Sequence, residues 1–288
     1  FNGAGRKAVP SILGGTGFGK PMIIKAMDEL NGLFPAFCSE PGKEQQPDPG
    51  DWRSADIAMA SFKKEYPNDA DKMDILIGTD PDADRCGVIV KVPQNQRHIY
   101  DGKDYALLPA DDAWSLVVWY RLKYEIDKYG AIQDADKKFI VQSHTTSDAM
   151  VRLALKHGLG VVRTWVGFAM LSAGVRHFWE KLPVPKLSHG RLSPEQEKCD
   201  PVIMECLNMT SERSINIAAM EQSNGFSLLG GAPKDKFSLG EGGHVRDKDG
   251  TIAGLLVAEI AAWAKEHNTS LIEILDKEIY LDPAIGLI

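Results

Sequence analysis

Hydrophobic and polar residues follow two different periods along this 288-residue chain. Short apolar runs rich in β-branched residues predict buried strands, and apolar residues spaced three or four positions apart predict amphipathic helices. Polar stretches rich in glycine and proline separate these segments and predict loops. Strands and helices alternate through most of the chain, and this order indicates the α/β class.

The first part of the chain centres on two predicted strands, "DILIG" (74–78) and "CGVIVKV" (86–92), joined by an acidic loop. Before them, residues 51–66 have helical spacing, with a predicted cap near Ser54. After them, residues 111–130 carry an apolar face and end at a glycine, which predicts a long helix.

A second α/β unit is predicted to begin near Ala135, which gives two expected domains, 1–134 and 135–288. In it, "KFIVQS", a capped helix and "LGVVRTWVG" form a predicted βαβ unit, so the two strands should be parallel. "SINIAAM" predicts a further strand followed by a turn, and Asp249 is the predicted cap of a long helix. Residues 187–200 interrupt the pattern and are expected to be an insertion.

Composition and charge narrow the class of protein. The chain is 43% hydrophobic and 25% charged, as soluble globular proteins are, and its net charge of -7 argues against general nucleic-acid binding. No apolar run reaches the ~18 residues that a membrane span needs. The four cysteines include no C-x-x-C pair, so we expect a reduced, cytoplasmic protein. Since the chain begins with Phe1, we also expect it to be a piece of a longer protein.

The predicted loop between the two strands carries Asp80, Asp82 and Asp84. Alternate residues of an extended chain share a side, so three carboxylates can point at one hard divalent cation. An EF-hand opens with the same spacing, but it needs glycine and glutamate where this chain has Arg85 and Lys91, so that interpretation fails. A solvated acidic turn remains the alternative; it leaves Arg85 and the close carboxylates unexplained.

Arg85 adds to the chemistry of this loop. Its guanidinium can bind a phosphate through two hydrogen bonds or brace a carboxylate. Mg²⁺ usually keeps some of its coordination shell for water or phosphate oxygens. A metal and an arginine beside open coordination positions suit phosphoryl transfer, in which positioning and charge neutralisation do most of the catalysis.

The stretch "TDPDADRCG" resembles the metal-binding loop of the α-D-phosphohexomutases, the phosphoglucomutase and phosphomannomutase superfamily. Further stretches agree with that family in order, and the resemblance covers nearly the whole chain. "RTWVGF" is similar to its sugar-choice loop, "MEQSNGF" to its sugar-binding loop and "VRDKDG" to a basic loop that often follows. "NGAGRKAVPSIL" and "SLIEILDKEIY" resemble the start of the second domain and the end of the third.

The resemblance implies two consecutive α/β domains with mixed sheets flanked by helices, the second and third of four. It also implies Mg²⁺ as cofactor, a phosphoserine in a preceding domain, and glucose 1,6-bisphosphate as intermediate and activator. The missing N- and C-terminal domains would be partners, and a hexose phosphate the substrate. The implied residues are the metal ligands Asp80, Asp82 and Asp84, the catalytic Arg85 and the substrate-binding Gly167, Glu221, Ser223, Arg246 and Lys248.

Three departures from the family pattern affect the functional prediction. No phosphoserine loop precedes the metal loop in the printed sequence, and Ser143, which follows it, is interpreted as structural or at most substrate-facing. We therefore expect the chain alone to be inactive. The family's fourth, phosphate-gripping domain is also missing from the printed sequence. A basic residue that many members carry soon after the glycine of the sugar-choice loop is replaced by Phe168 and its neighbours, which leaves the sugar open.

The sequence thus predicts part of a Mg²⁺-dependent phosphoglucomutase. The alternatives are a phosphomannomutase, a mutase of dual specificity, or a non-catalytic protein that binds sugar phosphate or metal. Single residues also have two interpretations. Arg246 and Lys248 could contact a phosphate or form a solvated charge run, and Trp165 could stack on a sugar or simply pack against its neighbours.

Overall fold

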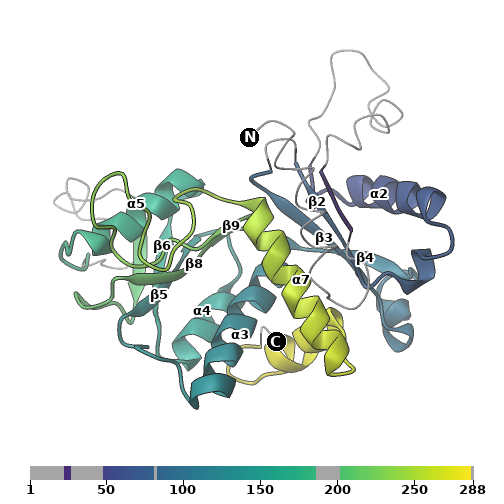
Figure 1. The fold of residues 1–288 in the computed structure, drawn as a ribbon. Helices are drawn as coiled ribbons and strands as arrows, with labels where there is room; N and C mark the ends of the chain where they lie inside the picture. Colours follow the sequence, from purple (N-terminus) through teal and green to yellow (C-terminus); the bar gives the residue numbers. More distant parts are fainter. Residues whose placement is uncertain (1–22, 27–47, 81–82, 186–201, 287–288) are drawn as a thin grey trace. The chain divides into compact units, whose positions relative to one another are not determined.

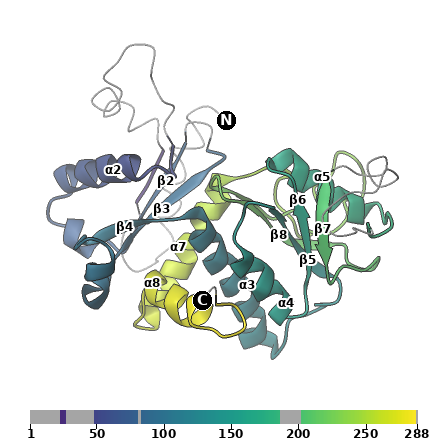
Figure 2. The same ribbon diagram turned by 180° about the vertical axis from the view of Figure 1, so that it is seen from behind.

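The computed structural model describes residues 23–26, 48–80, 83–185 and 202–286 (Figures 1 and 2). They form an α/β fold that divides into two compact units. The first unit comprises residues 1–113 and 249–275, and the second comprises residues 114–248 and 276–288. The predicted α/β class and the predicted mixed sheets are confirmed. In the described part of the chain, no helix is both long and apolar enough to cross a membrane.

The first unit contains a sheet in the order β1-β2-β3-β4. β1 pairs with β2 in parallel, and the other neighbours pair antiparallel. The predicted strands on either side of the acidic loop are therefore adjacent, with Thr79 opposite Cys86. The bounds are β1 Ile23–Ala26, β2 Ile75–Thr79, β3 Cys86–Lys91 and β4 Tyr105–Leu108, with short 3-10 helices at Ala70–Lys72 and Gln94–Ile99.

Helices cover both faces of this sheet. α2 (Trp52–Glu65) packs Met59 and Phe62 into a cluster with Leu76 and Ile89. Successive strand residues point to opposite faces, so the residues next to Leu76 in β2 and next to Ile89 in β3 face the other side of the sheet. α7 (Gly250–Glu266) contacts β2 and β3 and is followed by the short α8 (Leu271–Ile274).

Two helix caps test the sequence interpretation. The predicted cap near Ser54 is wrong: α2 begins after Asp51, whose side chain accepts a hydrogen bond from the backbone N–H of Arg53. Ser54 lies inside the first turn and is buried. Aspartate caps a helix as well as serine does, and here Asp51, three positions before Ser54, is the N-cap. The predicted cap Asp249 of α7 is confirmed by its bonds to the N–H groups of Thr251 and Ile252.

The second unit contains a sheet in the order β7-β6-β5-β8-β9. β5 pairs in parallel with β6 on one side and β8 on the other, while β7 and β9 join antiparallel at the edges. The predicted parallel βαβ unit is confirmed. The bounds are β5 Lys138–Ser143, β6 Gly160–Thr164, β7 Ile203–Leu207, β8 Ile215–Glu221 and β9 Gly225–Ser227.

The core of the second unit lies where helices cover this sheet. α5 (Phe168–Trp179) packs Leu171, Val175 and Phe178 against a cluster that includes Phe139 of β5. α4 (Asp148–Lys156) is the predicted crossover helix, capped by Ser147. α3 (Ala110–Tyr129) is the predicted long helix, and a π-helical turn covers Leu275–Tyr280.

The compact units do not follow a single cut in the chain. The expected boundary between residues 134 and 135 stays a prediction. α7 belongs to the first compact unit because it packs on β2 and β3. The expected insertion at 187–200 and the stretch "NGAGRKAVPSIL" lie outside the described residues.

Candidate functional site

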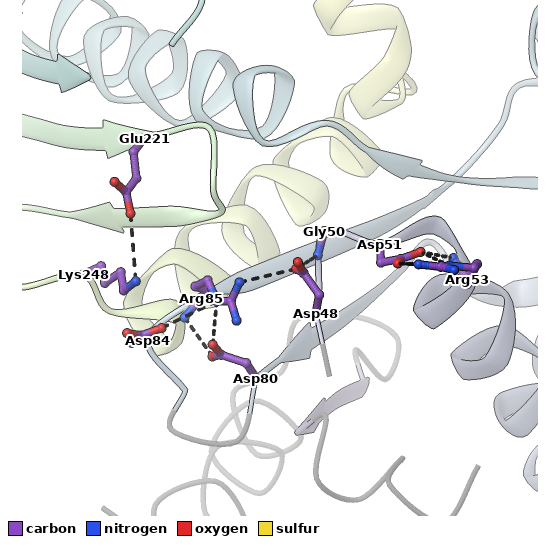
Figure 3. A network of polar contacts seen from close by, with 9 residues as sticks. All are labelled: Asp48, Gly50, Asp51, Arg53, Asp80, Asp84, Arg85, Glu221 and Lys248. Atoms are coloured by element: carbon purple, nitrogen blue, oxygen red, sulfur yellow. Dashed lines mark hydrogen bonds and ion pairs between the residues drawn. The ribbon is translucent and has the colours of Figure 1, made fainter. Parts of the chain in front are cut away.

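The acidic loop begins where β2 ends. Asp80, its first carboxylate, is only 3% exposed. Its Oδ1 accepts a hydrogen bond from the backbone N–H of Arg85 at 3.0 Å, and its Oδ2 accepts one from Arg85 Nε at 2.7 Å (Figure 3). Arg85 therefore braces a buried carboxylate, one of the two roles that the sequence left open.

Further carboxylates surround the same guanidinium. Arg85 Nη1 lies 3.6 Å from Asp48 Oδ1, and Arg85 Nε lies 3.9 Å from Asp84 Oδ1 (Figure 3). Burial lowers the pKa of Arg85, but the hydrogen bond to Asp80 and the charges of Asp80, Asp48 and Asp84 raise it, and the net pKa is raised. Arg85 is thus a fixed cation in an acidic cluster of the first unit.

A glycine positions Asp48 in this cluster. A Cβ on Gly87 of β3 would lie 2.1 Å from the backbone oxygen of Pro49, so only glycine lets the segment before α2 lie against the strand. That segment carries Asp48 to Arg85. Asp48 was not singled out in the sequence because it lies in a Pro- and Gly-rich loop far from the motif.

The loop fits a hard divalent cation in its donor chemistry. Asp80 and Asp84 supply carboxylate oxygens, the ligand type that Mg²⁺ prefers, and each carboxylate oxygen has a second lone pair for a ligand. The third predicted ligand, Asp82, lies outside the described residues. Within the described ranges, no group of three His, Cys, Asp or Glu side chains is arranged to hold a metal. The metal-ligand assignment stays a prediction.

The second candidate site lies at the carboxyl edge of the parallel strands in the second unit. Register pairs put Thr164 of β6 beside Ser143 of β5, and Met220 of β8 beside Gln142. β6 and β8 lie on either side of β5, so the residues that follow these three strands gather at one edge of the sheet. In open α/β sheets, ligands bind outside the carboxyl ends of the strands.

Glu221 ends β8 at this edge and is only 3% exposed. Trp114 Nε1 donates to its backbone oxygen at 3.0 Å. Its Oε1 lies 3.9 Å from Lys248 Nζ (Figure 3), and its buried Oε2 accepts no hydrogen bond from the described part of the chain. An unsatisfied buried acceptor costs about 1–3 kcal/mol, so this oxygen suits a ligand that brings a donor.

The turn after Glu221 leaves space for the Glu221 side chain. Asn224 has a φ of 63°, and Gly225 pairs with Glu221 across the hairpin. A Cβ on Gly225 would lie 2.8 Å from Glu221 Oε1 and 3.1 Å from Lys248 Cδ. Ser223, the other predicted sugar-binding residue of this turn, is exposed. Glycine here leaves space for the carboxylate and ammonium groups.

Ser143 is fully buried in the same edge. Its hydroxyl lies 2.7 Å from Thr146 Oγ1 and donates to Gln222 Oε1 at 2.9 Å. These contacts tie the loop after β5 to the loop after β8 and agree with its interpretation as a structural residue. Gln222 was not singled out in the sequence.

The loop after β6 contains Gly167 with a φ of 113° directly before α5. Gly167 therefore supplies a conformation that other residues avoid, at the point where the stretch that resembles the family's sugar-choice loop turns into the helix. Trp165 of this loop is 46% exposed, and its ring packs edge to face on the His144 ring, with the centroids 5.4 Å apart.

The structure separates the two basic residues predicted to bind substrate. Arg246 donates to the backbone oxygens of Lys236 and Ser238, and its guanidinium lies 5.9 Å from the Trp179 ring centroid. Lys248, in contrast, extends toward Glu221. The lysine lies at the candidate sugar site, whereas the arginine holds a loop; substrate binding by either residue stays a prediction.

Comparisons with known proteins agree with the resemblance. Residues 1–93 match the family model of phosphoglucomutase/phosphomannomutase, alpha/beta/alpha domain II. A phosphomannomutase of Mycoplasma pneumoniae is 29% identical over 107 residues, which are 37% of this chain and 17% of that protein. A phosphoglucomutase of Staphylococcus epidermidis is 24% identical over 177 residues, which are 62% of this chain and 27% of that protein.

A solved structure, described as that of a "putative phosphomannomutase" from Thermus thermophilus, superposes with a TM-score of 0.48 and 17% identity, over 94% of this chain and 49% of that one. The matches span only 17% and 27% of the length of these two curated relatives. Both curated relatives carry names from one group of enzymes.

Proposed function

We propose that this chain, which belongs to the phosphoglucomutase and phosphomannomutase superfamily, supplies the metal loop and the sugar-binding edge of a Mg²⁺-dependent phosphohexomutase. The observation that carries the proposal is the buried Asp80, held by Arg85 at both carboxylate oxygens, in the loop between two paired strands. This loop lies within the residues that match domain II of the family.

Each unit has a distinct task in this proposal. In the first unit, a bound Mg²⁺ would neutralise charge on the transferring phosphoryl group. Asp80 and Asp84 would hold it together with Asp82, while Arg85 fixes Asp80 and presents a positive charge beside it. In the second unit, Glu221 would accept hydrogen bonds from sugar hydroxyls, and Ser223 would donate or accept at the same turn.

The reaction proposed for the whole protein interconverts glucose 1-phosphate and glucose 6-phosphate. A phosphoserine outside these domains would give its phosphoryl group to the sugar, forming glucose 1,6-bisphosphate. The bisphosphate would return its other phosphoryl group to the serine oxygen, so that bonds and charges balance over the cycle. The printed sequence shows no serine loop before the metal loop. We therefore propose that this chain alone binds Mg²⁺ and a hexose phosphate but does not catalyse the interconversion.

The choice of sugar is part of the proposal. The matched relatives are named phosphomannomutase in one case and phosphoglucomutase in another. A phosphomannomutase or a mutase of dual specificity therefore remains the second candidate. Glucose and mannose differ only in the orientation of one ring hydroxyl, so competition between their 1-phosphates for the chain would decide between the candidates.

Titration calorimetry tests the proposal on the 288-residue chain. Mg²⁺ and glucose 1-phosphate are titrated separately into the unmodified chain, Asp80→Asn and Glu221→Gln. We expect Asp80→Asn to weaken Mg²⁺ binding alone, and Glu221→Gln to weaken sugar phosphate binding by about 1–3 kcal/mol with Mg²⁺ binding kept. Loss of Mg²⁺ binding in Glu221→Gln would show that the two loops have been given the wrong tasks.

Turnover is measured in the same preparations with Mg²⁺ and glucose 1,6-bisphosphate added. We expect no conversion of glucose 1-phosphate to glucose 6-phosphate. Conversion at a rate comparable to an intact mutase would contradict the proposed division of labour. If the unmodified chain binds neither Mg²⁺ nor a hexose phosphate, the proposed function itself is wrong.

A further inference from the structure

A cleft opens at the end of the first unit's sheet that lies opposite the acidic loop. It lies between the start of β2, the end of β3 and the C-terminal end of α7, and its volume is about 480 Å³. Pockets for small organic ligands have volumes of about 300–1,000 Å³. Ile75 and Val90, a register pair of β2 and β3, belong to its wall, and we call it the α7 cleft.

The α7 cleft is separate from the acidic loop. β2 runs from Ile75 at the cleft to Thr79, and Asp80 follows it. A strand rises about 3.3 Å per residue, so the Cα atoms of Ile75 and Asp80 are about 17 Å apart. A small molecule in the cleft therefore does not contact the predicted metal ligands.

The floor of the α7 cleft is apolar. Val90 and Val92 point the same way, because alternate residues of an extended chain share a side. The small side chains of α7 leave room between the helix and the sheet. The floor consists of buried residues from two strands and two helices: Ile75, Val90, Val92, Ala261, Ala264 and Leu271. Such a surface favours the apolar part of a ligand, since water is released from both on binding.

Arg97 is the first of two cations that we assign to a ligand. It lines the cleft, its side chain is 40% exposed, and its Nη2 lies 2.7 Å from Asp104 Oδ1. Its Nε is shielded from water and has no acceptor among the residues that the structure describes. A shielded donor without an acceptor is unfavourable, so a ligand oxygen that reaches this N–H when the flexible side chain turns is stabilised.

Lys265 of α7 is the second cation. Its ammonium forms an ion pair with Asp74, which directly precedes β2, and both residues line the cleft. An ammonium group has three N–H donors, so Lys265 can keep this contact and bind a further acceptor.

The other charged groups of the lining are directed to partners within the protein. Glu273 Oε2 accepts hydrogen bonds from the backbone N–H and the hydroxyl of Ser270, both at 2.9 Å. The Lys91 ammonium donates to the backbone oxygen of Asp71 at 2.7 Å, outside the lining. The chain as a whole has a net charge of -7, so the cations of this cleft are not part of a generally basic surface.

We infer that the α7 cleft binds a small organic phosphate, with the phosphate at Arg97 and Lys265 and the apolar part of the molecule on the floor. A phosphate monoester carries a charge of about -1.5 to -2 at pH 7 and three acceptor oxygens, so it suits two cations better than a carboxylate does. A guanidinium also matches phosphate geometry with two parallel N–H groups. This second ligand site goes beyond the proposed function, because it involves neither the metal loop nor the sugar-binding edge.

Titration calorimetry of the 288-residue chain with three probes tests the site. AMP carries both a phosphate and a flat ring system, adenosine lacks the phosphate, and inorganic phosphate lacks the ring system. We expect AMP to bind, and each of the other two to bind at least about tenfold more weakly. No binding of AMP up to millimolar concentration, or equally tight binding of adenosine or inorganic phosphate, would contradict the inference.

Two variants locate the bound phosphate. Arg97→Gln and Lys265→Met remove cations from separate elements, and each should weaken AMP binding about tenfold or more with little change in melting temperature. The matched control is Arg53→Gln, because Arg53 of α2 is 38% exposed and pairs with Asp51 much as Arg97 pairs with Asp104. It should leave AMP affinity unchanged. AMP affinity that stays the same in both cleft variants would overturn the site.

Competition with glucose 1-phosphate separates this inference from the proposed function. Saturating AMP should leave the affinity for glucose 1-phosphate unchanged, and Arg97→Gln should bind glucose 1-phosphate as the unmodified chain does. If AMP displaces glucose 1-phosphate, then AMP occupies the sugar-binding edge and the inference is wrong. If the chain binds AMP in a manner that depends on Arg97 and Lys265 but binds no hexose phosphate, the inference stands and the proposed function is wrong.

Discussion

The backbone N–H of Gly250 donates to the backbone oxygen of Ala83 at 3.0 Å. This bond joins the first residue of α7 to the acidic loop within the first unit. A Cβ on Gly250 would lie 2.2 Å from the oxygen of Arg85, so only glycine permits the approach. Ala83 itself has a φ of 60°, a left-handed conformation that the bond helps to hold.

Gly250→Ala should therefore displace the loop from Ala83 to Arg85. The obstacle is backbone, which cannot move aside as a flexible side chain can, so we expect a loss of about 1–3 kcal/mol in the free energy of unfolding. Displacement of a supporting contact should also lower Mg²⁺ affinity by about 10- to 100-fold. Urea denaturation and a Mg²⁺ titration measure the two effects.

The control for this prediction is Val257→Ala, which shortens a fully buried side chain about two turns further along the same helix. It should lower the free energy of unfolding by a similar amount and leave Mg²⁺ affinity unchanged. Equal Mg²⁺ affinity in Gly250→Ala and in the unmodified chain would show that the contact between α7 and the loop does not support metal binding.

The two described carboxylates of the loop should respond differently to substitution. Asp80→Asn removes a buried charge that Arg85 holds, and we expect it to cost about 1–3 kcal/mol of stability as well as Mg²⁺ affinity. The Asp84 side chain is 30% exposed and 3.9 Å from Arg85, so Asp84→Asn should change stability by less than about 0.5 kcal/mol. Both should weaken Mg²⁺ binding in calorimetry.

An Asp84→Asn variant that is as unstable as Asp80→Asn would mean that the ion pairs of this loop, and not the single Asp80 contact, hold its shape. Unchanged Mg²⁺ binding in both variants would show that the loop is a solvated acidic turn.

The strands and long helices could be predicted because the spacing of apolar residues along the chain indicates which side chains are buried. β2, β3, β5 and β8 are fully or largely buried apolar runs, and Trp114, Val117 and Val118 of α3 are all buried as their spacing predicted. The strands β7 and β9, at the edges of the sheet in the second unit, have no such buried apolar run and were not predicted. β7 is only partly buried, and β9 is three residues long.

The candidate sites could be predicted only in part. The residues of the acidic loop are close in sequence, so their spacing revealed them. Asp48 reaches Arg85 through a loop that packs on Gly87, and Lys248 reaches Glu221 across 27 residues of chain. Such long-range contacts depend on the folded backbone, and no local pattern records them.

The cap of α2 predicts a dependence of stability on pH. The side-chain hydrogen bond from Arg53 lowers the pKa of Asp51 more than burial raises it. A lowered folded-state pKa means that the stabilisation is present above the unfolded value of 3.8 and is lost as pH falls through the folded value. Asp51→Ala should therefore cost about 1 kcal/mol at pH 7, and less as pH falls below about 4.

Urea denaturation of both proteins from pH 7 down to acid pH measures this difference. Asp51→Asn keeps a capping side chain that does not titrate, so its stability should lack this acid-dependent component. A difference between Asp51→Ala and the unmodified chain that stays constant through acid pH would show that the carboxylate charge does not contribute.

The last prediction separates Arg246 from Lys248. Arg246 donates to two backbone oxygens of residues 236 and 238 and lies over the Trp179 ring, so Arg246→Gln should mainly destabilise that loop. A loss of 1 kcal/mol lowers the melting temperature by about 2–8 °C in domains of this size range. Lys248 Nζ lies 3.9 Å from Glu221 Oε1, so Lys248→Met should instead weaken sugar phosphate binding by about 1–3 kcal/mol.

Thermal denaturation and glucose 1-phosphate titration of the same two variants give four values to compare. We expect Arg246→Gln to lower the melting temperature and to keep an affinity close to that of the unmodified chain. We expect Lys248→Met to keep the melting temperature and to lower the affinity. If Arg246→Gln instead loses affinity as strongly as Lys248→Met at an unchanged melting temperature, then both residues bind the substrate, as the sequence predicted. The backbone contacts of Arg246 would in that case have to give way when the ligand arrives.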